Sequence, residues 1–320
     1  MTTIGRTLSA GIAVFSAIPF CAGCGPTGDR GAVLPQYAPP SAYSSLSYAV
    51  LARKQLLYVA DSFNNAVLIY DQAGTHQTPI GEITAGVNGP EGATTDSSGN
   101  LYVVNAGYPG EDTQVFAPGR RQPSRTLVTY NASPEDVAVA RDGTVFVGIR
   151  CCDTFAVYEH GALTPTYYVD DSTIYLPLGI AVNAKGTLYL DYCVEPHCPT
   201  VSIVTYAPGS MGPGKGTGIN LPFARGMRFD AKGNLVIADP ETPAIDVFPP
   251  GAKLPSFQFG KTGKPEYIAF NEAKTRLFVT DASTEQVLVY DYPSGRLVNT
   301  MDGIPGTSMT GVAAFPGPPQ

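Results

Sequence analysis

Short apolar segments alternate with turns along most of the chain, and they recur as one repeated unit. Each unit begins with a short apolar segment, turns tightly at a Gly or polar residue, and continues into a second β-rich segment. A third apolar segment and a weaker fourth one follow. Copies of the first two segments of the unit span 90–103, 134–147, 177–190, 224–237 and 265–279. The pattern has no helical periodicity, so each unit predicts four short β-strands.

The spacing of the units predicts their number and arrangement. The centres of the second segments are Tyr58, Tyr102, Phe146, Tyr189, Val236 and Phe278, which follow one another at 42 to 47 residues. Four short strands in a repeat of this length are typical of a propeller blade. The fold class is therefore all-β, a six-bladed β-propeller of four-stranded antiparallel blades.

The two ends of the repeat region are offset. The first unit has a second segment without a clear first one, and the chain ends on a first segment, Gly311 to Phe315. We predict that this C-terminal strand completes the first blade and closes the ring, because closure removes an open sheet edge. Residues 47–51 also resemble a first strand and are the alternative for that place.

The repeat resembles known propeller families. The cadence Pro-x-Gly-Ile-Ala-Val, Gly-x-Leu-Tyr-Val and Val-x-Val-Tyr is similar to that of NHL and SMP-30-like six-bladed propellers over residues 47–316. The NHL resemblance implies a rigid binding platform. The SMP-30 resemblance implies a lactonase or lyase with a channel metal held by Glu, Asn and Asp. WD40 propellers fit less well, since their Gly-His and Trp-Asp signatures are missing.

The N-terminal residues predict export. Arg6 precedes an apolar run, Leu8 to Phe20, which is short for a membrane span and suits a signal peptide. The run ends in Cys21-Ala22-Gly23-Cys24, which resembles a bacterial lipobox with Cys24 as the lipidated residue, although Cys21 stands where Leu is preferred. Ordinary secretion is the alternative. We divide the chain into a signal segment (1–24), a flexible tether (25–46) and a propeller (47–320), located outside the cytoplasm.

Composition and charge narrow the partners. The chain of 320 residues has a net charge of −7, so we expect no nucleic-acid binding. We also expect the protein to be a monomer. Turns after first and third strands should form one face, called the bottom face, and loops after second and fourth strands the other, called the top face. Cations of the bottom turns include Arg141, Lys185, Lys215, Lys232, Lys253, Lys274 and Arg296, whereas the top loops carry acids including Glu91, Glu135, Asp136, Asp171, Glu241 and Glu266. Charged turns that only maintain solubility would give the same pattern.

The mouth of the central channel on the top face is the main candidate site. The residues that enter the first strands are Thr310, Glu91, Glu135, Leu178, Arg225 and Glu266. The carboxylates of Glu91, Glu135 and Glu266 are possible calcium ligands, since calcium takes six to eight oxygens. Leu178 and Arg225 interrupt this ring, and an Arg225–Glu pair would leave no metal site.

The ends of the second strands and the top-loop aromatics add further candidates. The strands end at Asp61, Asn105, Ile149, Tyr192, Asp239 and Asp281, of which all but Ile149 join the predicted ligand-binding set. Asp and Asn at such ends also accept hydrogen bonds from loop amides, which is ordinary turn chemistry. The aromatic residues Tyr108, Tyr175 and Phe223 can stack on a peptide or sugar, or fill gaps between blades.

Four cysteines remain after the leader: Cys151, Cys152, Cys193 and Cys198. Both pairs follow a second strand, in adjacent blades, and export favours two disulfides. Local bridges, Cys151–Cys152 and Cys193–Cys198, are slightly favoured over bridges between blades. A zinc or copper site that includes His197 is the alternative.

Two functions from different classes follow from these features. The first is an extracytoplasmic scaffold that binds a protein, peptide or glycan through its top face, with a lipid at Cys24 holding the basic face towards the membrane. The alternative is a metal-dependent lactonase or lyase, which needs three oxygen ligands around one centre and an open position beside a base.

Overall fold

The computed structural model describes residues 55–74, 77–129, 132–150, 153–194, 198, 200–260, 263–302 and 306–315. The chain divides into two compact units, Met1–Leu34 and Pro35–Gln320, and the described residues all belong to the second. The predicted signal segment, lipidation site and tether lie outside the described residues, as does the segment 47–51. No helix in the described part is long and apolar enough to cross a membrane.

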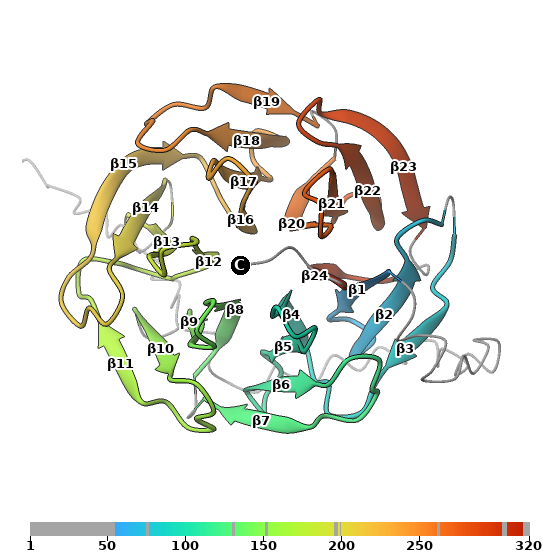
Figure 1. Cartoon of the computed structure of the whole chain (residues 1–320), viewed down its shortest axis with the longest axis horizontal. Helices are drawn as coiled ribbons and strands as arrows, with labels where there is room; N and C mark the ends of the chain where they lie inside the picture. Colours follow the sequence, from blue (N-terminus) through green and yellow to red (C-terminus); the bar gives the residue numbers. More distant parts are fainter. Residues whose placement is uncertain are drawn as a thin grey trace, which may run out of the picture. The chain divides into compact units, whose positions relative to one another are not determined.

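The described residues form six four-stranded antiparallel sheets arranged around a ring, so the six-bladed propeller is confirmed (Figure 1). The first strands, nearest the centre, are β24 (Met309–Phe315), β4 (Pro90–Thr95), β8 (Pro134–Val139), β12 (Ile180–Val182), β16 (Met227–Phe229) and β20 (Pro265–Phe270). The second strands are β1 (Leu56–Asp61), β5 (Leu101–Asn105), β9 (Val145–Ile149), β13 (Leu188–Cys193), β17 (Leu235–Asp239) and β21 (Arg276–Asp281).

The outer half of each blade follows the same order from blade 1 to blade 6. The third strands are β2 (Ala66–Asp71), β6 (Asp112–Phe116), β10 (Thr154–Tyr158), β14 (Val201–Tyr206), β18 (Ala244–Phe248) and β22 (Gln286–Asp291). The fourth strands, at the rim, are β3 (Gly81–Ile83), β7 (Arg125–Val128), β11 (Tyr167–Asp170), β15 (Lys215–Leu221), β19 (Phe257–Phe259) and β23 (Arg296–Asp302).

The C-terminal strand closes the ring, as predicted. β24 pairs antiparallel with β1, with Tyr58 opposite Ala313, and the sheet order of blade 1 is β24-β1-β2-β3. The first blade thus takes its innermost strand from the end of the chain. The alternative strand at 47–51 is not needed for this place.

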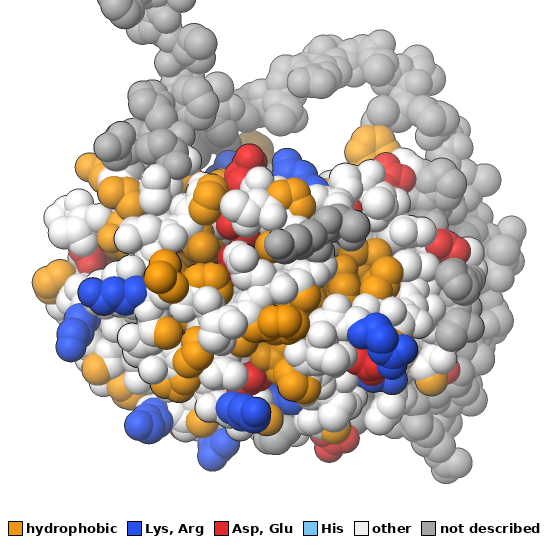
Figure 2. Space-filling model, turned by 90° about the horizontal axis from the view of Figure 1, so that it is seen from above, with side chains coloured by type: hydrophobic (Ala, Val, Ile, Leu, Met, Phe, Trp, Pro, Cys, Tyr) orange, Lys and Arg blue, Asp and Glu red, His pale blue; other side chains and the backbone are white. Residues whose placement is uncertain are grey.

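The core lies between the blades. One cluster of buried apolar side chains occupies each of the six blade interfaces; that between blades 6 and 1, for example, contains Tyr267, Phe278, Leu57 and Val312. Second strands are therefore buried on both faces, as the fully buried β1 shows. Outer strands are more exposed. In the side view of Figure 2, Lys and Arg side chains stand near the lower edge, at mid-height on both sides and at the upper edge, with hydrophobic side chains between them.

Two features of the repeat join neighbouring blades. The Tyr that ends several third strands reaches the preceding blade, as where the Tyr158 hydroxyl donates to the Val128 carbonyl at 2.9 Å. Gly at the beginning of the first strand, or directly before it, lets the next blade approach closely, since a Cβ at Gly226 would lie 2.6 Å from the Tyr267 Cα. At the same position blades 3 and 6 carry Asp136 and Tyr267 instead, and both side chains are fully buried.

Candidate functional site

The first strands bring four predicted residues together at the top mouth of the channel. Glu91 lies on β4, Glu135 on β8 and Glu266 on β20, and Arg225 precedes β16. The Arg225 guanidinium lies 3.0 Å from an oxygen of Glu135, 3.0 Å from one of Glu266 and 3.7 Å from one of Glu91. The Arg225 side chain keeps 19% exposure and Glu91 keeps 23%, so the cluster is accessible from the top face.

Arg225 occupies the centre where a cation would be held. The three carboxylates therefore point at a guanidinium and offer no shared open position, which does not fit the calcium ligand set Glu91, Glu135 and Glu266. Among the described residues, no group of three or more His, Cys, Asp or Glu side chains is arranged to hold a metal ion. The predicted pairing of Arg225 with a neighbouring Glu is present, with Glu135 and Glu266 as the partners at 3.0 Å.

Additional groups surround this cluster. Arg150, directly after β9, places its guanidinium 3.7 Å from Glu135, and its side chain is 49% exposed. The Tyr267 ring lies below Arg225, with the guanidinium carbon 5.8 Å from the ring centre, which is a cation–π contact. The site thus contains three carboxyl groups and two guanidinium groups.

Burial changes the proton affinity of the carboxyl groups. Burial raises the pKa of Glu91 to about 8; the nearby Glu135 adds to the rise, and Arg225 opposes it. Burial also raises the pKa of Glu266, although Arg225 opposes this rise. Near neutral pH, Glu91 is therefore protonated in a large fraction of molecules.

Two more acidic residues, Asp191 and Asp136, are buried among the inner strands close to this cluster. Asp191 on β13 is completely buried; its Oδ1 accepts from the amides of Leu178 (3.1 Å) and Gly179 (2.6 Å), and its Oδ2 has no hydrogen-bond partner. Burial raises the pKa of Asp191 well above its usual range. Asp136 is also buried, and this raises its pKa to about 6 against the opposing effect of Arg228.

Sequence reasoning missed Asp191 and Arg228. It assigned Tyr192, one residue further on, to the channel. Alternation along β13 sends the Tyr192 side chain into the cluster between blades 3 and 4, and Asp191 to the opposite face of the sheet, where its carboxyl group meets the Leu178 and Gly179 amides. An ionisable residue inside an otherwise apolar strand was the available signal for both missed residues.

The polar residues at the ends of the other second strands form hydrogen bonds within the fold. Asp61, Asn105, Asp239 and Asp281 are all buried and accept hydrogen bonds from loop amides. Asp281, for instance, accepts from the amides of Ser283, Thr284 and Lys264. These contacts match the turn chemistry that the sequence offered for the four residues, and their membership of the ligand-binding set stays a prediction. Asp136 and Asp171, assigned to the acidic top, are likewise buried.

Two exposed aromatic side chains, Phe63 and Tyr108, lie in the top loops that follow β1 and β5. Tyr108 is 70% exposed, in agreement with the prediction, and Phe63 is 55% exposed. Their loops are tied together by hydrogen bonds, from the Gly89 amide to Asn65 and from the Asn88 side chain to the Gly107 carbonyl. Phe223 packs instead against the cluster between blades 4 and 5, and Tyr175 is half-buried.

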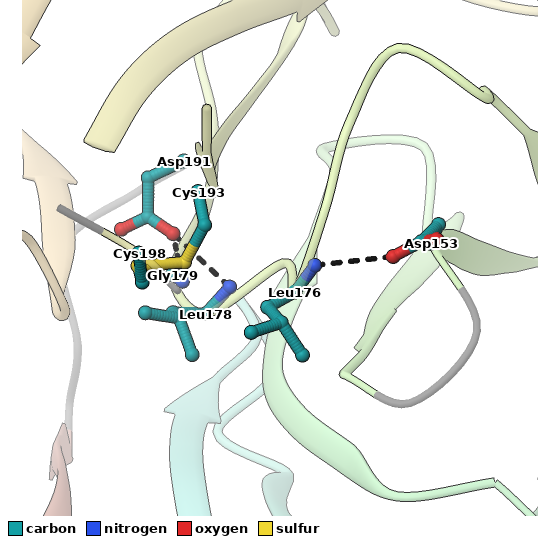
Figure 3. Close-up of a disulfide and its surroundings, with 7 residues drawn as sticks. All are labelled: Asp153, Leu176, Leu178, Gly179, Asp191, Cys193 and Cys198. Carbon is teal, nitrogen blue, oxygen red and sulfur yellow. Dashed lines mark hydrogen bonds between the residues drawn. A yellow bond between two sulfur atoms is a disulfide. The ribbon is translucent and has the colours of Figure 1, made fainter. Parts of the chain in front are cut away.

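A disulfide joins Cys193 and Cys198 in blade 4 (Figure 3). It closes the loop that follows β13, next to the segment Leu176–Gly179 that Asp153 and Asp191 hold through backbone amides. This is one of the two local bridges that the sequence favoured. Cys151, Cys152 and His197 lie outside the described residues.

Comparisons with known proteins support the fold. No protein-family model matches the chain, and no curated protein matches its sequence. Solved structures match it in 1317 chains, so the architecture is too widespread to indicate an activity. One of them, from the crystal structure of a nidogen/laminin complex, has a TM-score of 0.66 and 18% identity, and the match covers 81% of this chain and 98% of that one. This likeness establishes the propeller fold.

Proposed function

We propose that this propeller is a binding scaffold that takes a protein or peptide partner on its top face, with a basic side chain of the partner at the channel mouth. The observation that carries the proposal is the partly exposed cluster of Glu91, Glu135 and Glu266 around Arg225. Its three carboxyl groups outnumber the guanidinium groups of Arg225 and Arg150, so the cluster becomes negative when Glu91 ionises. The exposed Phe63 and Tyr108 offer apolar contact on adjoining loops. Aromatic anchors beside complementary charge are typical of protein interfaces. That a chain of a nidogen/laminin complex shares the fold is consistent with this role.

A random peptide library displayed on phage tests this proposal without a known partner. We expect panning on the purified protein to enrich peptides that contain Lys or Arg next to an apolar residue. Their binding should fall at least tenfold in Tyr108→Ser and stay within twofold in Leu254→Ser, because Leu254 is 78% exposed in a bottom turn. Affinity should rise from pH 6 to pH 8.5 as Glu91 ionises, and Glu91→Gln should remove this rise.

Two results would overturn the proposal: no enrichment, or enriched peptides that lose binding in Leu254→Ser and keep it in Tyr108→Ser. The lactonase or lyase alternative stays a prediction from resemblance. The position of Arg225 between the three carboxylates gives it no support.

We further propose that the chain is exported and anchored through a lipid on Cys24. The Cys193–Cys198 disulfide supports this, because disulfides persist in oxidising compartments and are rare in the cytoplasm. Expression in a bacterium with an alkyne-labelled fatty acid should label the full chain, and Cys24→Ser should abolish the label. Labelling that survives in Cys24→Ser would rule out this anchor.

A further inference from the structure

The bottom half of the channel forms a pocket of about 900 Å³. All six first strands contribute to its wall, mostly with small or aliphatic side chains such as Thr94, Val137, Ala181, Ala269 and Val312. It opens at the bottom face and is distinct from the top mouth, whose charged residues do not line it.

Arg228 forms the inner end of this pocket. From β16 its guanidinium donates to the carbonyl of Ala93 on β4 at 2.9 Å and approaches that of Ile180 at 3.5 Å, so it spans the channel between blades 2 and 4. The nearest carboxylate oxygen, on Asp136, lies 3.7 Å away. The inner end of the pocket therefore carries a guanidinium group whose charge the buried Asp136 offsets in part.

The rim of the pocket is positive. The turns between the first and second strands of four successive blades, 3 to 6, supply Arg141, Lys185, Lys232 and Lys274, and β15 adds Lys215. Together with Arg228, six cationic side chains face two carboxylates, Asp230 and Glu272. This local excess is opposite in sign to the net charge of −7 of the whole chain.

The cations approach each other across the opening. Lys274 and Arg141 belong to blades 6 and 3, on opposite sides of the ring, and Arg141 lies close enough to affect Lys274. Burial lowers the pKa of Lys274, Asp230 opposes this change, and the charge of Arg141 lowers it further. The Asp230 carboxylate is occupied by the amides of Lys232 and Asn234 and by the Tyr292 hydroxyl. A bound anion would offset this repulsion.

We propose that this bottom pocket binds a small ligand that carries phosphate or pyrophosphate groups. Several cations around a narrow opening favour an anion with more than one charge on a compact group. Small and aliphatic side chains below the rim accommodate an uncharged part of the ligand. The phosphate can belong to a soluble ester or to the headgroup of an anionic lipid. The site is independent of the proposed partner-binding face.

Calorimetric titration with inorganic pyrophosphate tests the pocket directly. We expect saturable binding to the full chain, weakened at least tenfold in the double variant Lys185→Gln/Lys232→Gln, whose side chains lie in exposed turns. The matched control is Lys253→Gln/Arg296→Gln, which removes two bottom-face cations that do not line the pocket and should change affinity less than twofold. Thermal unfolding of each variant verifies that it is folded.

Vesicles of phosphatidylcholine with a quarter phosphatidylglycerol separate the two ligand sources. If the protein binds these vesicles, if pyrophosphate displaces them and if the Lys185/Lys232 double variant does not bind them, the ligand of the pocket is a lipid headgroup. If the protein binds pyrophosphate but not the vesicles, the ligand is a soluble ester. The proposal is wrong if neither probe binds, or if the control variant weakens binding as much as the pocket variant does.

Discussion

The Arg225 side chain determines whether the carboxyl groups at the channel mouth can bind a cation. In a ring of carboxylates alone, the mouth would attract a hard cation. With Arg225 within 3.0 Å of Glu135 and Glu266, the cluster is largely compensated internally, and Glu91 is left as its most weakly paired member at 3.7 Å. Burial and the nearby Glu135 raise the pKa of Glu91, and Arg225 at this distance offsets only part of the rise.

The titration of Glu91 predicts a pH-dependent stability. Because its folded-state pKa is raised, its contribution to the free energy of unfolding is fully present below about pH 4.5 and is lost as the pH rises through about 8. Glu91→Gln should therefore lose less stability than the native protein between pH 5 and pH 9. Each unit of pKa shift corresponds to about 1.4 kcal/mol at full effect, and the 23% exposure of the side chain reduces it. Urea unfolding across this pH range measures the difference.

The control for this prediction is Glu241→Gln, which removes an exposed carboxylate from a top loop. Asp136 and Asp191 remain in both variants, so some loss of stability with rising pH persists in each. A Glu91→Gln curve parallel to the native one would show that Glu91 is already ionised in the folded protein.

At the scale of the strands, the repeated unit could be predicted because the residue type at each position is determined by contacts within one blade or with the next one. The apolar segments gave the strands, and the Gly of the first strand allows the next blade to approach, as Gly226 does beside Tyr267. The final Tyr of third strands such as β10 bonds the preceding blade. These are properties of one blade against its neighbour, and a single repeat contains them.

The composition of the channel could not be predicted from the repeat, because it depends on where the blades depart from one another. Asp136 replaces the Gly of the first strand, Arg228 interrupts β16, and Asp191 is buried against the amides of Leu178 and Gly179, whereas Tyr192 packs between blades 3 and 4. Each partner lies on another blade, as when Arg228 reaches the Ala93 carbonyl. The sequence predicted that Glu91, Glu135, Arg225 and Glu266 converge at the mouth. It did not predict that Arg225 contacts all three Glu side chains, because these contacts form only when the ring is closed.

At the scale of the whole molecule, the ring is held at the interface where its two ends meet. β24 pairs with β1 within blade 1, and its Met309 and Val312 are buried in the cluster shared with blade 6. The Thr310 hydroxyl also donates to the Pro90 carbonyl of blade 2 at 2.8 Å. The last strand therefore contacts both neighbouring blades as well as its own.

Deleting this strand should destabilise the propeller as a whole. A chain that ends at Asp302 loses β24, and burial of a large apolar side chain such as Met309 or Val312 is worth about 1.5–3 kcal/mol. Since a domain is stable by only about 5–15 kcal/mol, we expect loss of the cooperative thermal transition, measured by circular dichroism. A chain that ends at Phe315 keeps β24 and should unfold at the native midpoint. If the chain ending at Asp302 also does so, another segment, with residues 47–51 the first candidate, can take the innermost place in blade 1.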